Sequence, residues 1–563
     1  MMMPIDTRPL KRLLALLRMD RREITYIYLF AIVSGAISLS LPLGIQAIVN
    51  LISGGQLASS WGVLIAFVVI GVGFTGAMQV MQLVLSEHIK QRLFVRATLE
   101  FAYRLPRISY KALDGAYLPE LVNRFFDTMT IQKGVNKVLL DIPVAGLQIL
   151  LGLILLAFYH PFFILFGMFV AIILLLVFRS TSRIGLATSL EESKQKYAAA
   201  HWLQELGRSN STFKLAGETT LPVSKADTLA TKYVTARKTH FKVLLGHYWA
   251  LVGFKVLVSL SMLLLGGLLV MNEQMNIGQF VAAEIVIMLV INAVEKILLG
   301  FESVYDVLTA LEKMGDITDL PLERGDGMNI AVTTDKALGM AIELRDLSFR
   351  SHWNDAPVFH NVDLVIAAGE KICVTGAPGA GKTTLLHLLA GLLEPNEGSV
   401  LMDGQGLKSL SLENVRSATG DSFTHEDIFT GTVMENIIMG RPWITDEQAR
   451  STATVTGLMP MLADLPKGLL SKLDPHGSRL PQSLIRRIIL TRCMASRPRL
   501  VLFEEEVMPL EGEELEQYLG LLTGPNAPFT MVAVSDRPEF QRRCDRLIRI
   551  EDGTIRIVSN SFN

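Results

Sequence analysis

The chain has 563 residues, of which 50% are hydrophobic and 19% are charged, and its formal net charge is −1. This length exceeds that of one ordinary domain, and the near-neutral charge lacks the basic excess typical of nucleic-acid-binding proteins. We therefore expect no nucleic-acid partner. The mean hydropathy of +0.38 is high for a soluble protein. Together these values predict a membrane domain joined to a soluble domain.

The cysteines are few and lie only in the last 200 residues, at Cys373, Cys493 and Cys544. Their spacing fits neither a metal site nor a disulfide framework, which indicates a reducing, cytosolic compartment for that half.

The first half of the chain contains six apolar segments long enough to cross a bilayer, which requires about 20 helical residues. The segments are 24–51, 61–86, 138–159, 162–179, 243–271 and 277–300. The basic stretch 1–23 has no cleavable signal pattern and is predicted to be a cytosolic leader. We assign residues 24–311 to a multi-pass transmembrane domain.

The loops between these segments predict the orientation in the membrane. The short loops, which contain no Lys or Arg, are 53–60, 160–161 and 272–277. The long loops 87–137 and 180–242 are rich in both residues, and basic loops remain in the cytoplasm. Both termini are therefore predicted to be cytosolic. The long loops also have helical patterns, so we expect the membrane helices to extend into the cytoplasm and to turn near 109–117 and 213–221.

Charged and titratable residues are rare inside the predicted spans, and each is a functional candidate. Lys255 and Glu295 lie at similar predicted depth on spans five and six, at 1.5 Å of helix rise per residue. One interpretation is a structural ion pair between neighbouring helices. The other is that Lys255, Glu284 or His247 lines a substrate cavity, and the sequence does not separate the two.

After the last span, the polar, turn-rich stretch 312–339 predicts a linker, and residues 340–563 predict an α/β nucleotide-binding domain. The segment "EKICVTGAPGAGKTTLLHLLAGLL" (370–393) has the pattern of a strand, a glycine loop and a helix. It satisfies the phosphate-loop motif, in which backbone N–H groups surround phosphates at a helix N-terminus. The residues predicted to bind ATP phosphates are Gly376, Ala377, Pro378, Gly379, Ala380, Gly381, Lys382, Thr383 and Thr384.

Within this motif, Lys382 is expected to reach the terminal phosphates and the Thr383 hydroxyl to ligate Mg²⁺. A second hydrophobic strand, "RLVLFEEE" (499–506), ends in carboxylates. Such a strand beside a phosphate loop commonly supplies the Mg²⁺ shell and polarises the attacking water. The predicted cofactors are therefore ATP and Mg²⁺.

Six spans with long cytosolic loops, a linker and this nucleotide module resemble the ATP-binding cassette (ABC) exporters, over residues 10–557. The chain is most similar to half-transporters of the type I secretion and peptide-export group. The resemblance implies a membrane α-helical bundle with six transmembrane helices fused to an α/β P-loop nucleotide-binding domain. It also implies that Glu504 serves Mg²⁺, that Glu505 acts on the attacking water, and that 109–117 and 213–221 are coupling helices.

The same resemblance implies a dimer that encloses two ATP molecules, most simply a homodimer, in the lipid bilayer of a bacterial inner membrane. Each nucleotide then contacts the phosphate loop of one cassette and the signature helix of the other. Secretion systems of this group imply an adaptor protein and an outer-membrane channel as partners.

The signature motif of the family, LSGGQ, is degenerate here. Its place is taken by "LPQSL" (480–484), so that Pro481 and Ser483 replace the serine and the second glycine. Proline suits the first turn of a helix, and the following N–H groups still favour an anion. Close backbone approach to a phosphate is nevertheless impaired.

Further departures affect residues that contact the nucleotide. The switch histidine is replaced by Asp536, which repels a γ-phosphate when ionised. Thr424 or His425 stands in place of the switch glutamine, and Glu511 in place of the dimer-loop aspartate. Ser351 stands at the position of the adenine-stacking aromatic, for which His352 or Trp353 could substitute; we select Trp353.

Three functions remain open at this stage. The first is an ATP-dependent homodimeric exporter of a peptide or protein with divergent, slow ATPase sites. The second is an ATP-binding, non-hydrolysing subunit that regulates or completes a transport complex, which can be heterodimeric. The third is a lipid or drug flippase of the same architecture. The sequence does not identify the transported substrate.

Overall fold

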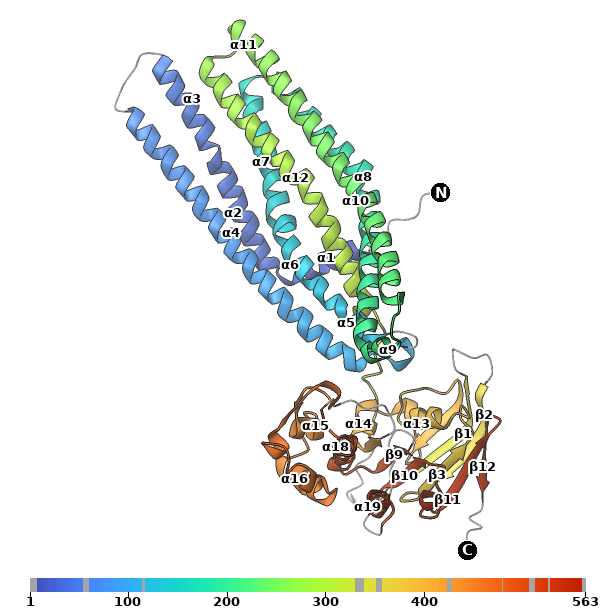
Figure 1. The fold of residues 1–563 in the computed structure, drawn as a ribbon. Helices are drawn as coiled ribbons and strands as arrows, with labels where there is room; N and C mark the ends of the chain where they lie inside the picture. The colour runs from blue at the N-terminus through green and yellow to red at the C-terminus, as the bar shows by residue number, and fades with distance from the viewer. Residues whose placement is uncertain are drawn as a thin grey trace. The chain divides into compact units, whose positions relative to one another are not determined.

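The computed structural model describes residues 8–53, 60–113, 117–329, 339–350, 357–422, 428–477, 479–505, 512–524 and 527–558. It divides into two compact units (Figure 1). The first comprises Met1–Ile108 with Gly115–Pro321, and the second comprises Ser109–Asp114 with Leu322–Asn563. The boundary between Pro321 and Leu322 falls inside the predicted linker.

The regular elements of the first unit are all helices among its described residues. Its α-helices are α1 (Arg8–Met19), α2 (Arg21–Ser38), α3 (Ser40–Ser53), α4 (Ser60–Arg104), α5 (Leu118–Val122), α6 (Asp127–Asn136), α7 (Ile142–Tyr159), α8 (Phe162–Arg208), α9 (Asn210–Leu215), α10 (Leu221–Ser261), α11 (Gly267–Met271) and α12 (Ile277–Thr318). Short π-helical segments join α6 to α7 and α10 to α11, at Lys137–Asp141 and Met262–Gly266. The expected turns appear where α4 gives way to α5 and where α9 gives way to α10.

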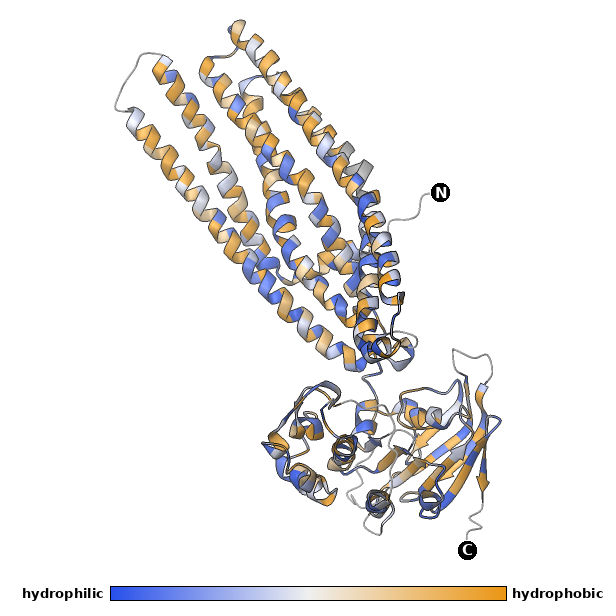
Figure 2. Cartoon of the chain, in the orientation of Figure 1, coloured by the Kyte–Doolittle hydropathy of each residue, from blue (hydrophilic) through white to orange (hydrophobic). Residues whose placement is uncertain are grey.

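Several of these helices are long and apolar enough to cross a membrane. Five such stretches occur among the described residues: Arg21–Ser53, Trp61–Arg107, Leu118–Tyr159, Leu221–Met271 and Ile277–Thr318. A further apolar stretch, Phe162–Ile173, is shorter and begins α8. Most side chains in the rest of the predicted span 162–179 lie outside the described part of the chain. Figure 2 shows hydrophobic residues along the helices toward α3 and α11, and more hydrophilic residues toward α5 and α9.

Helix α12 is the most buried of these helices and forms the centre of the first unit. Many of its buried positions recur every four residues, and Val286 and Val290 among them face α7, because a residue four positions along lies on the same side of a helix. The two helices approach closely at Gly152, where an added Cβ would lie 3.0 Å from Val290. Small residues at such crossings let membrane helices pack by direct contact.

Helix α12 also carries Glu295, whose carboxylate accepts a hydrogen bond from the Lys255 ammonium of α10 at 2.8 Å. The ion pair of the first interpretation is therefore present. His247 is buried with its ring 5.5 Å from that of Phe301, and Glu284 Oε2 is buried without a hydrogen-bond partner among the described residues.

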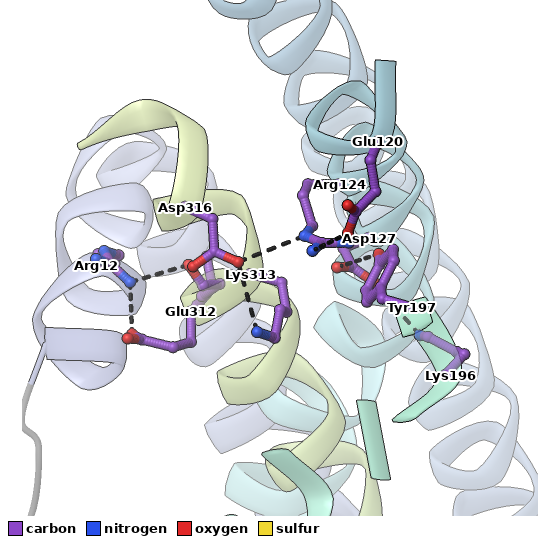
Figure 3. A network of polar contacts seen from close by, with 10 residues as sticks. Arg12, Glu120, Arg124, Asp127, Lys196, Tyr197, Glu312, Lys313 and Asp316 are labelled. Carbon is purple, nitrogen blue, oxygen red and sulfur yellow. Dashed lines mark hydrogen bonds and ion pairs between the residues drawn. The ribbon is translucent and has the colours of Figure 1, made fainter. Parts of the chain in front are cut away.

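The end of α12 near α1 holds a charged cluster that the sequence did not predict (Figure 3). Arg12 of α1 donates to the Glu312 carboxylate at 2.6 Å and to the Leu311 carbonyl at 3.1 Å. Gly315 leaves room for this guanidinium, since an added Cβ would lie 2.4 Å from it. Helix α12 continues to Thr318, so residues 312–318 of the predicted linker are helical.

The same helix is joined to α6 and α8 through Arg124 (Figure 3). Its guanidinium lies 3.4 Å from Asp316 and stacks 3.6 Å above the ring of Tyr197. The Tyr197 hydroxyl in turn donates to buried Asp127 at 2.6 Å. Ion pairs and ring contacts thus connect four helices of the first unit at this end.

The second unit is α/β. Its strands are β1 (Ile342–Arg350), β2 (Pro357–Ile366), β3 (Lys371–Gly376), β4 (Glu397–Met402), β5 (Gln405–Gly406), β6 (Thr419–Ser422), β7 (Gly431–Thr432), β8 (Lys472–Leu473), β9 (Leu500–Glu504), β10 (Thr530–Val534), β11 (Arg546–Glu551) and β12 (Thr554–Val558). The central sheet has the order β12-β11-β3-β10-β9-β6 among the described strands and is parallel except for β12. A second, antiparallel sheet has the order β2-β1-β4-β5.

The helices of this unit are α13 (Lys382–Leu389), α14 (Leu412–Ser417), α15 (Val433–Ile438), α16 (Asp446–Val455), α17 (Leu458–Met461), α18 (Gln482–Ala495), α19 (Gly512–Thr523) and α20 (Pro538–Gln541). Both faces of the central sheet are covered, which explains why its strands are continuously apolar. Leu502 of β9 packs in one buried cluster with α13, whereas its neighbour Phe503 packs in another with α18 and α19.

Candidate functional site

The glycine loop after β3 has the strand–loop–helix geometry predicted for it. Strand β3 is buried to Thr375, and α13 begins at Lys382 with Gly381 as its N-cap. Gly381 has a φ of 102°, and a Cβ there would lie 2.7 Å from Val358, so only glycine fits. Ala377, Pro378 and Gly379 between them are exposed. This backbone leaves the loop surface open for phosphates at the helix N-terminus.

The Lys382 side chain is only 6% exposed, and its ammonium stays at the loop. It donates to the Gly376 carbonyl at 2.7 Å and lies 3.6 Å from a carboxylate oxygen of Asp536. The second oxygen of Asp536 accepts a hydrogen bond from the Thr375 hydroxyl. The sequence predicted Lys382 at this position but not its proximity to Asp536.

Thr383 and Glu504 come together as the predicted Mg²⁺ ligands require. The Thr383 hydroxyl donates to the Glu504 carboxylate at 2.7 Å, and Glu504 is buried. A hydroxyl and a carboxylate are hard oxygen donors of the kind that Mg²⁺ takes, usually with waters and substrate phosphates completing its shell. The donor set therefore fits the metal, and these two residues would hold it.

Glu505, the predicted residue for the attacking water, is also buried. Its carboxylate accepts a hydrogen bond from the Ser535 hydroxyl and lies 2.7 Å from Nε of Arg537. The Arg537 N–H donates to the Ser535 hydroxyl at 3.2 Å, which fixes the turn. We call residues 535–537 the β10 turn.

The order of the strands explains why these groups meet. Strand β10 lies between β3 and β9, and Val534 is in register with both Val374 and Glu504. The phosphate loop, the β10 turn and the two glutamates therefore leave the sheet at the same edge. Parallel sheets commonly bind ligands at the carboxyl ends of their strands.

Cys373 lies on β3 beside this edge without a chemical role in it. Hydrogen bonding with Cys544 and burial both raise the pKa of the Cys373 thiol above its ordinary value. The thiol stays protonated, and a protonated thiol is a poor nucleophile.

The segment 480–484, predicted to be a divergent signature motif, forms the start of α18. The helix begins at Gln482, so Pro481 is its N-cap and not a member of its first turn as predicted. Pro481 and Gln482 are exposed, whereas Leu484 is buried in the core beneath them. An N-cap proline provides no side-chain acceptor for the helix N–H groups, and none is present here.

Some predicted site residues lie outside the described part of the chain: Ser351, His352, Trp353, Thr424, His425 and Glu511. Conversely, sequence reasoning did not select Thr375, Ser535 or Arg537. The only available signal for Ser535 and Arg537 was their position beside Asp536, directly after an apolar strand.

Comparison with known families agrees with this arrangement. The family described as "ABC transporter" matches residues 359–507, and "ABC transporter transmembrane region" matches residues 24–294. A solved structure of a bacterial Atm1-family ABC exporter with ATP bound superimposes with a TM-score of 0.83 at 18% identity, covering 95% of this chain and 94% of the other. The predicted fold class and the predicted ABC resemblance are confirmed.

Curated relatives share only part of their length with the chain. The alpha-hemolysin translocation ATP-binding protein HlyB of Escherichia coli O157:H7 is 25% identical over 53% of this chain and 42% of its own. The mycobactin import ATP-binding/permease protein IrtB of Mycolicibacterium smegmatis is 28% identical over 54% and 52%. A probable microcin-H47 secretion/processing protein, MchF, of Escherichia coli is 27% identical over 52% and 41%. The chain thus matches about half or less of each relative.

Proposed function

The chain belongs to the ABC transporter family, and from this premise we propose that it is an ATP-driven exporter of a bacterial inner membrane. We assign it a peptide or protein substrate and a homodimeric assembly. The observation that carries the proposal is the grouping of Lys382, Thr383, Glu504 and Glu505 at one edge of the central sheet. The relatives named for translocation or secretion support the substrate class.

In this proposal each site residue has a role that follows from its chemistry. The loop N–H groups and Lys382 bind the phosphates, and Thr383 with Glu504 would hold Mg²⁺, which would neutralise phosphate charge. Glu505 orients and deprotonates the attacking water, a step for which its carboxylate first has to exchange its contact with Arg537 for the water. Positioning and electrostatics account for most of the catalysis of phosphoryl transfer.

The first unit supplies the transport path in this proposal. Its long apolar helices suit a bilayer, and both termini together with the second unit face the cytosol. The proposed homodimer brings α18 of one chain to the nucleotide of the other. An adaptor protein and an outer-membrane channel are proposed partners on the basis of the secretion relatives.

ATPase turnover of the purified chain in lipid vesicles tests the proposal. We expect measurable turnover that Glu505→Gln lowers by roughly 10²- to 10⁴-fold, the usual contribution of a general base. Lys382→Ala should abolish it, and Glu513→Gln, the same change on an exposed glutamate, should leave it intact. Wild-type turnover no higher than that of Lys382→Ala would refute the ATPase, and a monomeric mass in native mass spectrometry would refute the dimer.

The β10 turn favours a second candidate, a nucleotide-binding subunit that does not hydrolyse ATP. Asp536 pairs with Lys382, and Arg537 pairs with Glu505. Lys382 and Glu505, the two groups needed for hydrolysis, therefore already have protein partners. This candidate predicts saturable ATP binding without turnover. A partner half-transporter that restores turnover on mixing would support it over the homodimer.

A further inference from the structure

The Asp536 carboxylate lies beside the Lys382 ammonium, where a phosphate of a bound nucleotide is expected. One of its oxygens accepts from the Thr375 hydroxyl, and the other lies 3.6 Å from the Lys382 ammonium. Thr375 directly precedes the glycine loop 376–381, and Lys382 directly follows it. The carboxylate therefore contacts both ends of the loop.

The backbone fixes Asp536 in this position. The Ser535 N–H donates to the Val374 carbonyl at 3.2 Å, continuing the pairing of β10 with β3. Pro538, two residues after Asp536, begins α20. Because the backbone is fixed on both sides of Asp536, its side chain can leave the loop only by changing its own rotamer.

We propose that Asp536 competes with the terminal phosphate of a bound nucleotide for the Lys382 ammonium, so that binding exchanges a carboxylate for a phosphate. The proposal rests on the proposed binding of ATP at this loop. Two anions cannot both lie against one ammonium without repelling each other at a few ångströms. Because Lys382 is expected to serve the γ-phosphate, Asp536 penalises ATP more than ADP.

The charges around the loop make this competition matter. Asp536 lies near Lys382 and Glu505 near Arg537, whereas Glu504 accepts from the Thr383 hydroxyl, so these four charged partners and Glu504 carry a formal net charge of −1. Asp536 itself is 56% exposed, and solvent can take up its carboxylate once it leaves Lys382. The exchange is thus possible and reversible.

Equilibrium binding of ADP and of ATP with a β,γ-imido bridge, which resists hydrolysis, tests the proposal on the full chain in detergent. We expect Asp536→Asn to tighten binding of the ATP analogue by roughly 3- to 10-fold, the effect of removing one nearby, partly screened charge. ADP binding should tighten less, so the ratio of the two affinities should rise. Glu539→Gln removes an equal charge from an exposed site three residues away and should change neither affinity.

The outcomes separate this inference from the proposed function. Binding by wild type with an unchanged affinity ratio in Asp536→Asn overturns the exchange alone. Absence of nucleotide binding in both proteins overturns both proposals, whereas binding by Asp536→Asn alone supports the exchange. Thermal unfolding of the variant checks its fold, and Asp536→Ser provides a second neutral residue that must shift the ratio in the same direction.

Discussion

Two turns leave the same edge of the central sheet and differ in how far they follow the family pattern. The phosphate loop after β3 matches the motif throughout, and its geometry is that of a phosphate cradle. The β10 turn has Asp536 where the resemblance predicts a switch histidine, and it directs Asp536 to Lys382 and Arg537 to Glu505. The comparison teaches that an intact loop does not by itself make an active site, because neighbouring strands decide which partners its residues have.

The sharpest test of the intact turn is Lys382→Ala. We expect ATP binding to weaken about 10- to 100-fold, because a charge-assisted hydrogen bond contributes about 1.5–3 kcal/mol. Fluorescent-nucleotide titration measures the affinity. Lys467→Ala, on an exposed loop of the same unit, should have no effect. If both variants bind ATP equally well, the loop is not the nucleotide site.

Thr383→Ala tests the Mg²⁺ assignment within the same turn. The hydroxyl contacts Glu504 at 2.7 Å. Its loss should reduce the Mg²⁺-dependent gain in ATP affinity by roughly 10-fold and leave binding in EDTA almost unchanged. Titrations with and without Mg²⁺ provide the measurement, with Thr454→Ala on exposed helix surface as control. An equal loss in EDTA would show that the residue acts on the fold and not on the metal.

The difference between the two turns also marks what could be predicted from the sequence. The phosphate loop was predictable because its strand, motif and helix are contiguous in the chain, and the position of Glu504 and Glu505 because a hydrophobic strand ends in them. The contacts of Asp536 and Arg537 depend on β10 lying between β3 and β9, which no local pattern encodes. The charged cluster around Arg12 was hidden for the same reason, since it joins α1 to the end of α12. The pair Lys255–Glu295 was one of two interpretations that the sequence offered, because charges are rare in apolar spans, and the structure shows the contact.

Arg537→Ala tests the divergent turn through stability. Glu505 would keep its hydrogen bond from the Ser535 hydroxyl but lose its ion pair with Arg537. The Glu505 side chain is 7% exposed and the Arg537 side chain 34%. Allowing for the exposure of Arg537, we expect a loss of about 1 kcal/mol, or roughly 2–4 °C in the unfolding midpoint. Arg543→Ala, which breaks an exposed pair with Glu516, should shift the midpoint by less.

A double variant sharpens this result. If the cation stabilises the buried carboxylate, Glu505→Gln should remove most of the penalty of Arg537→Ala, since a neutral amide needs no counter-charge. Arg537→Lys should retain part of the wild-type midpoint. Additive losses in the double variant would mean that Arg537 acts through packing instead of through Glu505.

The smallest expected change in stability comes from Pro481→Ser, which restores the serine of the signature at the N-cap of α18. The new hydroxyl can cap the helix, which stabilises the fold by about 1 kcal/mol. Loss of the proline makes the unfolded chain more flexible, which destabilises the fold by roughly 0.4–1 kcal/mol. The two nearly cancel, so stability should change by less than about 0.5 kcal/mol.

A change in ATPase turnover of Pro481→Ser then reports on the nucleotide contact itself. In the proposed homodimer the hydroxyl should raise turnover roughly 2- to 5-fold through one added hydrogen bond. Pro466→Ser, at an exposed position, should leave turnover unchanged. Equal turnover in both variants would place the limiting fault at the β10 turn and not at the signature helix.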